Sequence, residues 1–150
     1  MRRDLSKKKF KFSGGKIRIG IVCSEFNSHI VDKLLKETTD ELKCQGISNV
    51  ATINVPGALE IPIAVNKLAK TKSFDVIIAL GVVIKGETYH FKYVSEESIR
   101  GIMQISLKTE IPVISGILTV KNEKQAIKRI QRGKEFARSA IHIFHTLNKI

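Results

Sequence analysis

Cysteine is scarce in this sequence, and long apolar runs are missing altogether. Cys23 and Cys44 are the only two cysteines among 150 residues, too few for a disulfide framework and typical of a reducing cytosol. No apolar run approaches the ~20 residues that a membrane-spanning helix requires. The basic N-terminus has no apolar segment of signal-peptide length. These absences favour a cytoplasmic protein over a secreted or membrane-embedded one.

Acidic side chains are also few, with 14 Asp and Glu against 26 Lys and Arg, for a formal net charge of +12. This excess has three interpretations: nucleic-acid binding, steering of anionic small substrates, or lysine-rich helix faces that are simply solvated. The third fits the helical spacing of much of the charge. Six Lys or Arg and the pair Gly14-Gly15 fall within the first 15 residues, which predicts a flexible basic arm at 1–15.

The rest of the chain, residues 16–150, is predicted to form one domain. Four segments have the apolar, β-branched pattern of strands, at 16–23, 49–55, 74–84 and 112–120. Each is followed by a helical pattern, at 30–45, 58–70, 95–110 and from 122 onward. This alternation predicts an α/β fold of parallel strands with helices on both faces. The unbroken apolarity of 74–84 predicts a strand that is buried on both sides.

Local signals refine several of these boundaries. Gly46 is expected to end the first helix, and Pro62 fits the first turn of the second. Ser95 is expected to cap the third helix, with two glutamates in its first turn. Asn122 is expected to cap the last helical segment. The apolar positions beyond it fit either one long helix or two helices with a break near Gly133.

Polar and small residues gather where the predicted strands end. Ligands of parallel α/β sheets bind outside the carboxyl ends of the strands, so these exits belong together. The four exits are Ser24–Asn27, Pro56–Glu60, Lys85–His90 and Ser115–Lys121. The opposite strand ends carry much less chemistry. We therefore expect the 85–90 loop to form one wall of a ligand pocket.

Several exit residues have both a functional and a structural interpretation. Phe26 either offers its ring to a flat heterocycle or packs under the following helix. Glu60 either accepts hydrogen bonds from a ligand or decorates a helix N-terminus. Gly86–Thr88 either cradles an anion or forms an ordinary turn. His90 either transfers protons at neutral pH or is a solvated loop histidine.

Cys23 and the histidines near the C-terminus have simpler interpretations. Cys23 lies in a buried strand pattern and is expected to be an inert core thiol. His142 and His145 are spaced i, i+3 but lack a nearby cysteine or carboxylate, so we expect them at the surface. No metal site is predicted.

Five segments together resemble one known family. They are FN after the first strand, VPGALEIP, ALGVVIKGETYHFKYV, PVISGILTV and NEKQAIKR. In this order and spacing, from residue 17 to about 145, the chain is similar to 6,7-dimethyl-8-ribityllumazine synthases. The combination of VPGALEIP with GxVIxGxTxH carries the resemblance, because no single segment is specific.

The resemblance implies a flavodoxin-like three-layer sandwich around a four-stranded parallel sheet. It also implies a transferase that catalyses the penultimate step of riboflavin biosynthesis. That reaction condenses 5-amino-6-(D-ribitylamino)uracil with 3,4-dihydroxy-2-butanone 4-phosphate to 6,7-dimethyl-8-ribityllumazine, and releases phosphate and water. The family uses no metal or organic cofactor. Its members are homopentamers with active sites shared between neighbours, and some build sixty-subunit capsids; the sequence leaves this choice open.

The same resemblance assigns the site residues. His90 would be the catalytic proton-transfer residue. The substrate-binding residues would be Phe26, Asn27, Gly57, Ala58, Leu59, Glu60, Val83, Ile84, Gly86, Glu87, Thr88, Ser115 and Arg129. The ring of Phe26 would stack on the pyrimidine, while Asn27 and the turn that follows Gly57 would hold the ring edge and the ribityl hydroxyls. Backbone at Val83 and Ile84 would contact the pyrimidine. The 86–88 turn and Arg129 would bind the phosphate.

Two departures from the family pattern bear on function. Ser115 stands where the family often has an aromatic residue, which predicts a wider or more polar pocket there. The segment after Arg129, IQRGKEFARSA, is shorter than the usual glycine- and lysine-rich turn, and Lys134 is the candidate for its second lysine. These departures motivate an alternative, a flavin- or lumazine-binding module without turnover. Nucleic-acid binding ranks last, because no recognisable motif accompanies the charge.

Overall fold

Four parallel strands form a single sheet in the order β2-β1-β3-β4. The structure is a computed structural model that describes residues 17–150, so the arm predicted at 1–15 lies outside the described residues. The strands are β1 (Arg18–Ser24), β2 (Asn49–Val55), β3 (Val76–Ile84) and β4 (Val113–Val120). The helices are α1 (Ser28–Cys44), α2 (Ile61–Lys70), α3 (His90–Thr109), α4 (Glu123–Lys128) and α5 (Arg132–Leu147), with a 3₁₀ turn η2 (Ala58–Glu60) before α2. The predicted α/β class is confirmed.

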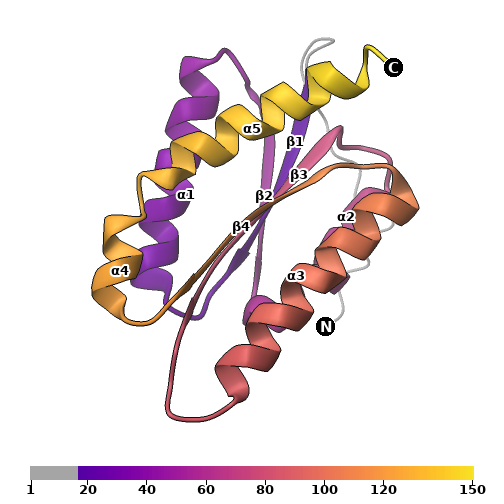
Figure 1. Cartoon of the computed structure of the whole chain (residues 1–150). Helices are drawn as coiled ribbons and strands as arrows, with labels where there is room; N and C mark the ends of the chain where they lie inside the picture. The colour runs from indigo at the N-terminus through magenta and orange to yellow at the C-terminus, as the bar shows by residue number, and fades with distance from the viewer. Residues whose placement is uncertain (1–16) are drawn as a thin grey trace.

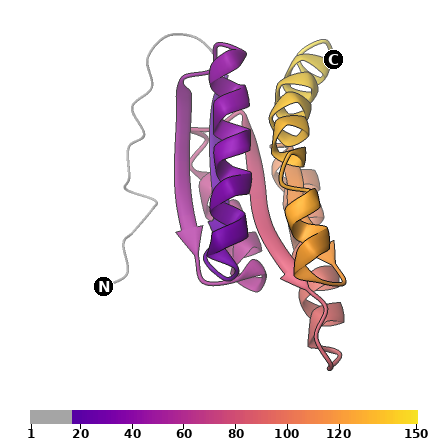
Figure 2. The same cartoon turned by 90° about the vertical axis from the view of Figure 1, so that its left-hand side faces the viewer.

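Two apolar clusters cover the two faces of the sheet. Figures 1 and 2 show α1 and α5 on one face, and α2 and α3 on the other. Alternate residues of β3 belong to different clusters: Ile78 packs with the α1 and α5 side, while Ile77 packs with the α2 and α3 side. This period-2 alternation is why β3 is apolar throughout. The prediction that this strand is buried on both faces is confirmed.

The start of α3 corrects the sequence prediction. The helix begins at His90 rather than after Ser95. The His90 amide donates to Thr88 Oγ1 at 3.4 Å, and Ser95 is buried inside the helix, where its hydroxyl donates to the Phe91 carbonyl at 2.7 Å. Phe91 and Val94 pack into the α2–α3 cluster, so their burial extends the helix toward its N-terminus. His90 is therefore a helix residue and not a loop residue.

The C-terminal helical segment is two helices. The break lies at residues 129–131, just before Gly133, which decides between the two alternatives. Asn122 Oδ1 accepts from the Gln125 amide at 2.9 Å, so the predicted cap of α4 is confirmed. Ile127 of α4 is 52% exposed, so it does not continue the buried apolar face of α5. Because α4 and α5 are separate helices, their apolar residues do not follow one continuous helical period.

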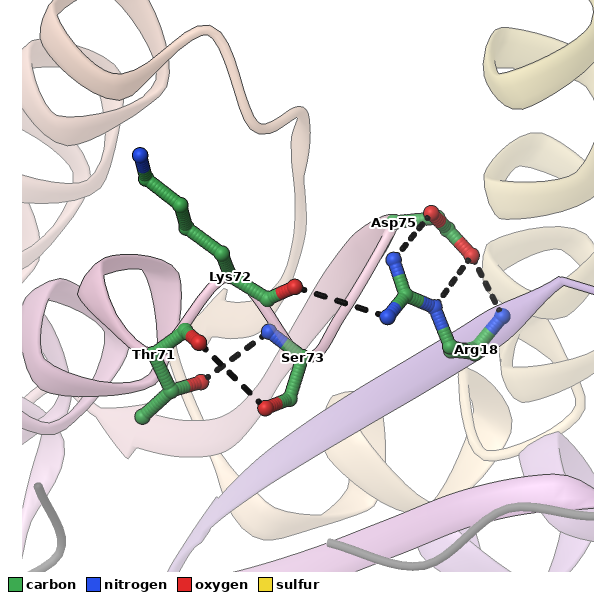
Figure 3. Close-up of polar contacts among 5 residues, drawn as sticks. All are labelled: Arg18, Thr71, Lys72, Ser73 and Asp75. Carbon is green, nitrogen blue, oxygen red and sulfur yellow. Dashed lines mark hydrogen bonds and ion pairs between the residues drawn. The ribbon is translucent and has the colours of Figure 1, made fainter. Parts of the chain in front are cut away.

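The amino ends of the strands are closed by an ion pair. Arg18 of β1 donates from its amide and Nε to Asp75 Oδ2, at 2.8 and 3.2 Å, and from Nη2 to Oδ1 at 2.9 Å. Its Nη1 also donates to the Lys72 carbonyl at 3.4 Å. Figure 3 shows these two side chains pointing toward each other beside the turn that precedes β3. Charge-assisted hydrogen bonds therefore join the starts of β1 and β3 at this edge of the sheet.

Neither cysteine forms a disulfide. Cys23 is buried in β1, where burial raises the pKa of its thiol to about 12, and Cys44 is exposed on α1. The prediction that Cys23 is a core residue is confirmed by its burial, and its raised pKa favours the protonated thiol at neutral pH. Within residues 17–150, no helix has the length and apolarity needed to cross a membrane.

Candidate active site

A mostly apolar cavity of about 550 Å³ opens at the carboxyl ends of β1, β2 and β3. This edge lies at the bottom of Figure 1, where α3 begins. We call it the apolar cavity, and its lining residues are Phe26, Pro56, Gly57, Ala58, Leu59, Glu60, Val82, Val83, Ile84, Gly86, Thr88, His90, Phe91 and Val94. Apolar walls with a few polar groups are typical of small-molecule sites. The predicted pocket wall after β3 is therefore present.

Two backbone hydrogen bonds present Phe26 at this cavity. The Glu25 amide donates to the Val55 carbonyl at 2.7 Å, and the Phe26 amide donates to the Pro56 carbonyl at 3.0 Å. The chain after β1 therefore remains joined to the chain after β2. The Phe26 ring is 71% exposed, so it does not pack under α1. An exposed aromatic ring at a cavity wall can stack on a planar ligand.

The Pro56-Gly57 turn brings a carboxylate to the cavity. A Cβ built on Gly57 would lie 3.1 Å from Glu60 Oε2, a close contact that glycine avoids. Glu60 is the last residue of η2 and its side chain is exposed. Its carboxylate oxygens can accept hydrogen bonds from ligand hydroxyls.

His90 lies on the same cavity as Phe26. It is the first residue of α3, is exposed, and is preceded by the Thr88 hydroxyl that accepts its amide hydrogen bond. Residues 86 and 88 line the cavity beside it. The histidine and the aromatic residue therefore line one cavity.

A second, strongly basic cavity of about 710 Å³ adjoins the first. We call it the basic cavity, and it is lined by Lys85, Thr88, Tyr89, Phe91, Lys92, Glu96, Thr119, Val120, Lys121, Gln125 and Arg129. Four of these side chains are cationic and one is anionic, so the cavity favours an anionic ligand. Thr88 and Phe91 line both cavities, so a shared wall separates them.

Arg129 is held where α4 ends. Its Nη1 donates to the Gln125 carbonyl at 3.1 Å. The Gln125 side chain in turn accepts the Lys121 amide at 2.8 Å, which fixes the exit of β4. The remaining guanidinium N–H groups can form bidentate hydrogen bonds to an anion such as a phosphate.

Most predicted site residues meet at this edge, but not all in one cavity. Phe26, Glu60 and His90 share the apolar cavity, whereas Arg129 lines the basic one. Asn27, Glu87 and Ser115 line neither. Ser115 is exposed on the edge strand β4, paired with Ala79, which is four residues before Val83 in β3. It is therefore remote from the apolar cavity of its own chain.

Several lining residues are not among those predicted from the sequence. Phe91 and Val94 were overlooked because the helix was expected to begin after them, although their helical spacing with Ile102 was the available signal. Lys92 lies between the loop expected at 85–90 and the helix expected at 95–110, so no role is predicted for it. In residues 17–150 there is no group of three or more His, Cys, Asp or Glu that could hold a metal ion. His142 and His145 are exposed on α5, as predicted.

These features define a flavodoxin-like α/β protein with a small-molecule site at the carboxyl edge of a four-stranded parallel sheet. The sequence profile of 6,7-dimethyl-8-ribityllumazine synthase matches residues 16–148. The chain is 48% identical over 134 residues to the protein of that name from Nitrosospira multiformis, which covers 87% of this chain and 84% of the relative. It is 43% identical over 140 residues to the one from Methylibium petroleiphilum, covering 91% and 88%. The chain belongs to the 6,7-dimethyl-8-ribityllumazine synthase family.

Proposed function

We propose that this chain condenses 5-amino-6-(D-ribitylamino)uracil with 3,4-dihydroxy-2-butanone 4-phosphate. The products are 6,7-dimethyl-8-ribityllumazine, phosphate and water, as in the penultimate step of riboflavin biosynthesis. One observation carries the proposal beyond family membership. An apolar cavity with an exposed aromatic ring and a histidine shares a wall with a cavity that has four cationic side chains. A planar heterocycle and a phosphate ester are the ligands that such a pair suits.

The apolar cavity receives the pyrimidine in this proposal. The Phe26 ring stacks on the heterocycle, and backbone groups at Val83 and Ile84 hold its edge. The turn from Gly57 to Glu60 faces the ribityl chain, with the Glu60 carboxylate accepting from its hydroxyls. Ala58 and Leu59 complete that wall. Asn27, next to Phe26, donates a side-chain hydrogen bond to the Val82 carbonyl at the same cavity wall.

The phosphate lies on the side of the turn after β3. Open space lies beside Gly86, where a Cβ would meet nothing within 4 Å, so the ester has room there, and Thr88 adds a hydroxyl. Glu87, between them, is exposed. Arg129 binds the phosphate and stabilises it as it leaves. The lysines of the basic cavity add attraction at longer range.

His90 is the proposed proton-transfer residue. Imine formation, loss of phosphate and ring closure each move protons, and one imidazole can take part in several of these steps. Much of the remaining acceleration comes from holding the two substrates together, which general chemistry values at several kcal/mol. These steps are proton transfers and the loss of phosphate and water, with no net change of oxidation state that would call for a redox cofactor. The proposal therefore includes no metal or organic cofactor.

The proposal includes self-association, to a homopentamer or a multiple of pentamers. The α3 helix carries Ile99, Met103 and Leu107 at i, i+4 and i+8, on one side of the helix, and all three are exposed in the isolated chain. Exposed apolar stripes of this kind mark interfaces between protein chains. Ser115, on the exposed edge strand, and Arg129 would then serve a neighbouring copy's site as well as or instead of their own. The partners are the two substrates and other copies of the chain, without nucleic acid or membrane, in the cytoplasm.

An assay with both substrates tests the reaction. The purified protein is mixed with the uracil and the butanone phosphate, and the absorbance of the lumazine product is followed against a protein-free sample. The proposal predicts faster product formation that scales with protein concentration. Folded protein that binds lumazine tightly but does not accelerate its formation would instead support the binding module. In that outcome the enzymatic proposal fails.

A further inference from the structure

Asn27 makes an unusual hydrogen bond for a residue in front of a helix. An asparagine at this position ordinarily accepts a hydrogen bond from the first turn of the helix. Asn27 makes no such cap to α1. Its Nδ2 instead donates to the carbonyl of Val82 in β3, at 2.9 Å, across 55 residues of sequence. The side chain is therefore used to join two strand exits rather than to cap a helix.

This bond continues the link between β1 and β3 beyond their backbone pairing. The last paired residues of these strands are Cys23 and Leu80, whereas β3 and β4 remain paired as far as Ile84 and Val120. Val82 lies two residues past Leu80, on a part of β3 that β1 no longer covers. The Asn27 amide provides a donor there in place of the missing strand.

The consequence falls on Phe26. Its own amide is bonded to Pro56 on the β2 side, and the next side chain is bonded to Val82 on the β3 side. The Asn27 backbone has φ 61° and ψ 38°, a left-handed conformation that asparagine tolerates better than most residues. An exposed ring has little packing to order it, so its attachment point is restrained by these two anchors, by the Glu25 amide bond to Val55, and by the amides of Ile30 and Val31, which donate to the Asn27 carbonyl.

We propose that Asn27 is a positioning residue, which ties the Phe26 loop to Val82 so that the ring is held ready at the apolar cavity. One of the two Nδ2 hydrogens is engaged by the Val82 carbonyl and is not available to a substrate. Restraining a loop before a ligand arrives lowers the entropy that binding must supply. Only the identity of the ligand rests on the proposed function. The hydrogen bond that restrains the loop is present in the ligand-free chain.

A ligand-free measurement tests the restraint. The sequence has no tryptophan, so the Phe26→Trp variant contains a single indole at the cavity. Time-resolved fluorescence anisotropy then reports the local motion of that indole. Adding Asn27→Gly keeps a residue that accepts φ 61° but removes the amide, and adding Asn27→Asp keeps the size but replaces the donor by an acceptor. Both additions should increase the amplitude of fast motion, with unchanged far-ultraviolet circular dichroism.

The control for that measurement is Ser28→Gly, which adds backbone freedom one residue further on and leaves the amide in place. It should leave the fast motion near that of the Phe26→Trp parent. Equal restraint of the indole in all four proteins would overturn the proposal. So would an effect of Ser28→Gly as large as that of Asn27→Gly, because general loosening of the loop would then explain both.

A thermodynamic cycle with ligand separates positioning from direct binding. Affinity for 6,7-dimethyl-8-ribityllumazine is measured for the native protein, Asn27→Gly, Phe26→Ala and the double variant. Loss of one hydrogen bond predicts about threefold to tenfold weaker binding for Asn27→Gly, and no further loss in the Phe26→Ala background. Equal losses in both backgrounds would contradict the proposal, since Asn27 would then contact the ligand itself. A native protein without lumazine affinity would count against the proposed function, and the anisotropy result would still decide the positioning role.

Discussion

Arg18 and Asp75 are joined by two side-chain hydrogen bonds and one backbone hydrogen bond at the amino edge of the sheet. The two residues are 57 positions apart and link the start of β1 to the start of β3. At the carboxyl edge, where both cavities open, the described chain has a different pair: His29 at the start of α1 contacts Glu123 at the start of α4.

The first prediction concerns pH and this ion pair. Burial raises the pKa of Asp75, but the hydrogen bonds from the Arg18 side chain and amide, together with its charge, outweigh burial and hold the pKa below its usual value. The carboxylate therefore stabilises the fold fully above its ordinary pKa of about 4, and this contribution is lost as pH falls through the lowered value. Urea unfolding from pH 7 to 3 should show Asp75→Asn about 1 kcal/mol less stable at pH 7. The difference should shrink below pH 4; a constant difference would contradict the assignment.

The second prediction concerns the crossing of α1 and α5. A Cβ on Gly133 would lie 2.7 Å from the Leu34 carbonyl oxygen and 2.9 Å from Thr38 Oγ1. Gly133→Ala should therefore destabilise the protein by about 1–2 kcal/mol in denaturant unfolding, despite the better helix propensity of alanine.

Ser139→Ala is the matched control for Gly133→Ala, because Ser139 is exposed on the same helix. Its free energy of unfolding should stay within about 0.5 kcal/mol of the native value. If both variants gain stability together, the close approach of the two helices is wrong.

The third prediction concerns proton transfer. His90→Gln should lower kcat by about tenfold to a hundredfold, because water replaces the imidazole less effectively, while lumazine affinity changes little. His142→Gln, an exposed position on α5, should keep the native rate. Steady-state kinetics with both substrates distinguishes these outcomes, and a native kcat for His90→Gln would remove this residue from the mechanism.

The fourth prediction concerns the phosphate. Arg129→Met should raise the KM for the butanone phosphate about tenfold or more, with a smaller effect on the KM for the uracil. Arg132→Met is the control, because that guanidinium is paired with Glu135 on the outside of α5. Equal effects on both KM values would show that Arg129 acts on the fold rather than on the phosphate.

The fifth prediction concerns self-association. Leu107 is 75% exposed and Met103 is 59% exposed on α3. Leu107→Asp should shift sedimentation toward smaller species, because a charge would be buried in the interface. Lys149→Gln changes the net charge by the same amount at the C-terminus and should sediment like the native protein. A native assembly for Leu107→Asp would exclude this face of α3 from the interface.

The fold was predictable from the sequence because apolar strands alternate with amphipathic helices, a pattern typical of a parallel sheet between two helical layers. The continuous apolarity of β3 and the alternation of strand and helix are properties of single segments. The start of α3 was mispredicted because Ser95 and the following glutamates resemble a helix start. Burial of Phe91 and Val94 by α2 and the sheet outweighed that local signal.

The sequence predicted that the candidate site lies at the strand exits. It did not predict that the site is divided into an apolar and a basic cavity. The exits of parallel strands must lie at one edge, so Phe26, Glu60 and His90 could be grouped from sequence. Whether Arg129 joins them depends on how α4 is oriented after β4, which no local pattern encodes. The tie between Asn27 and Val82 spans 55 residues and likewise has no sequence signal of its own.

The proposed function requires both substrates of one reaction to meet at the carboxyl edge of the sheet, within one chain or between neighbouring copies. The direct measurement is the ratio of phosphate released to lumazine formed by the native protein, with and without the uracil. The account predicts one phosphate for each lumazine, and phosphate release above the protein-free rate only when the uracil is present. Phosphate released at the same rate without the uracil, or no protein-dependent formation of either product, would contradict it.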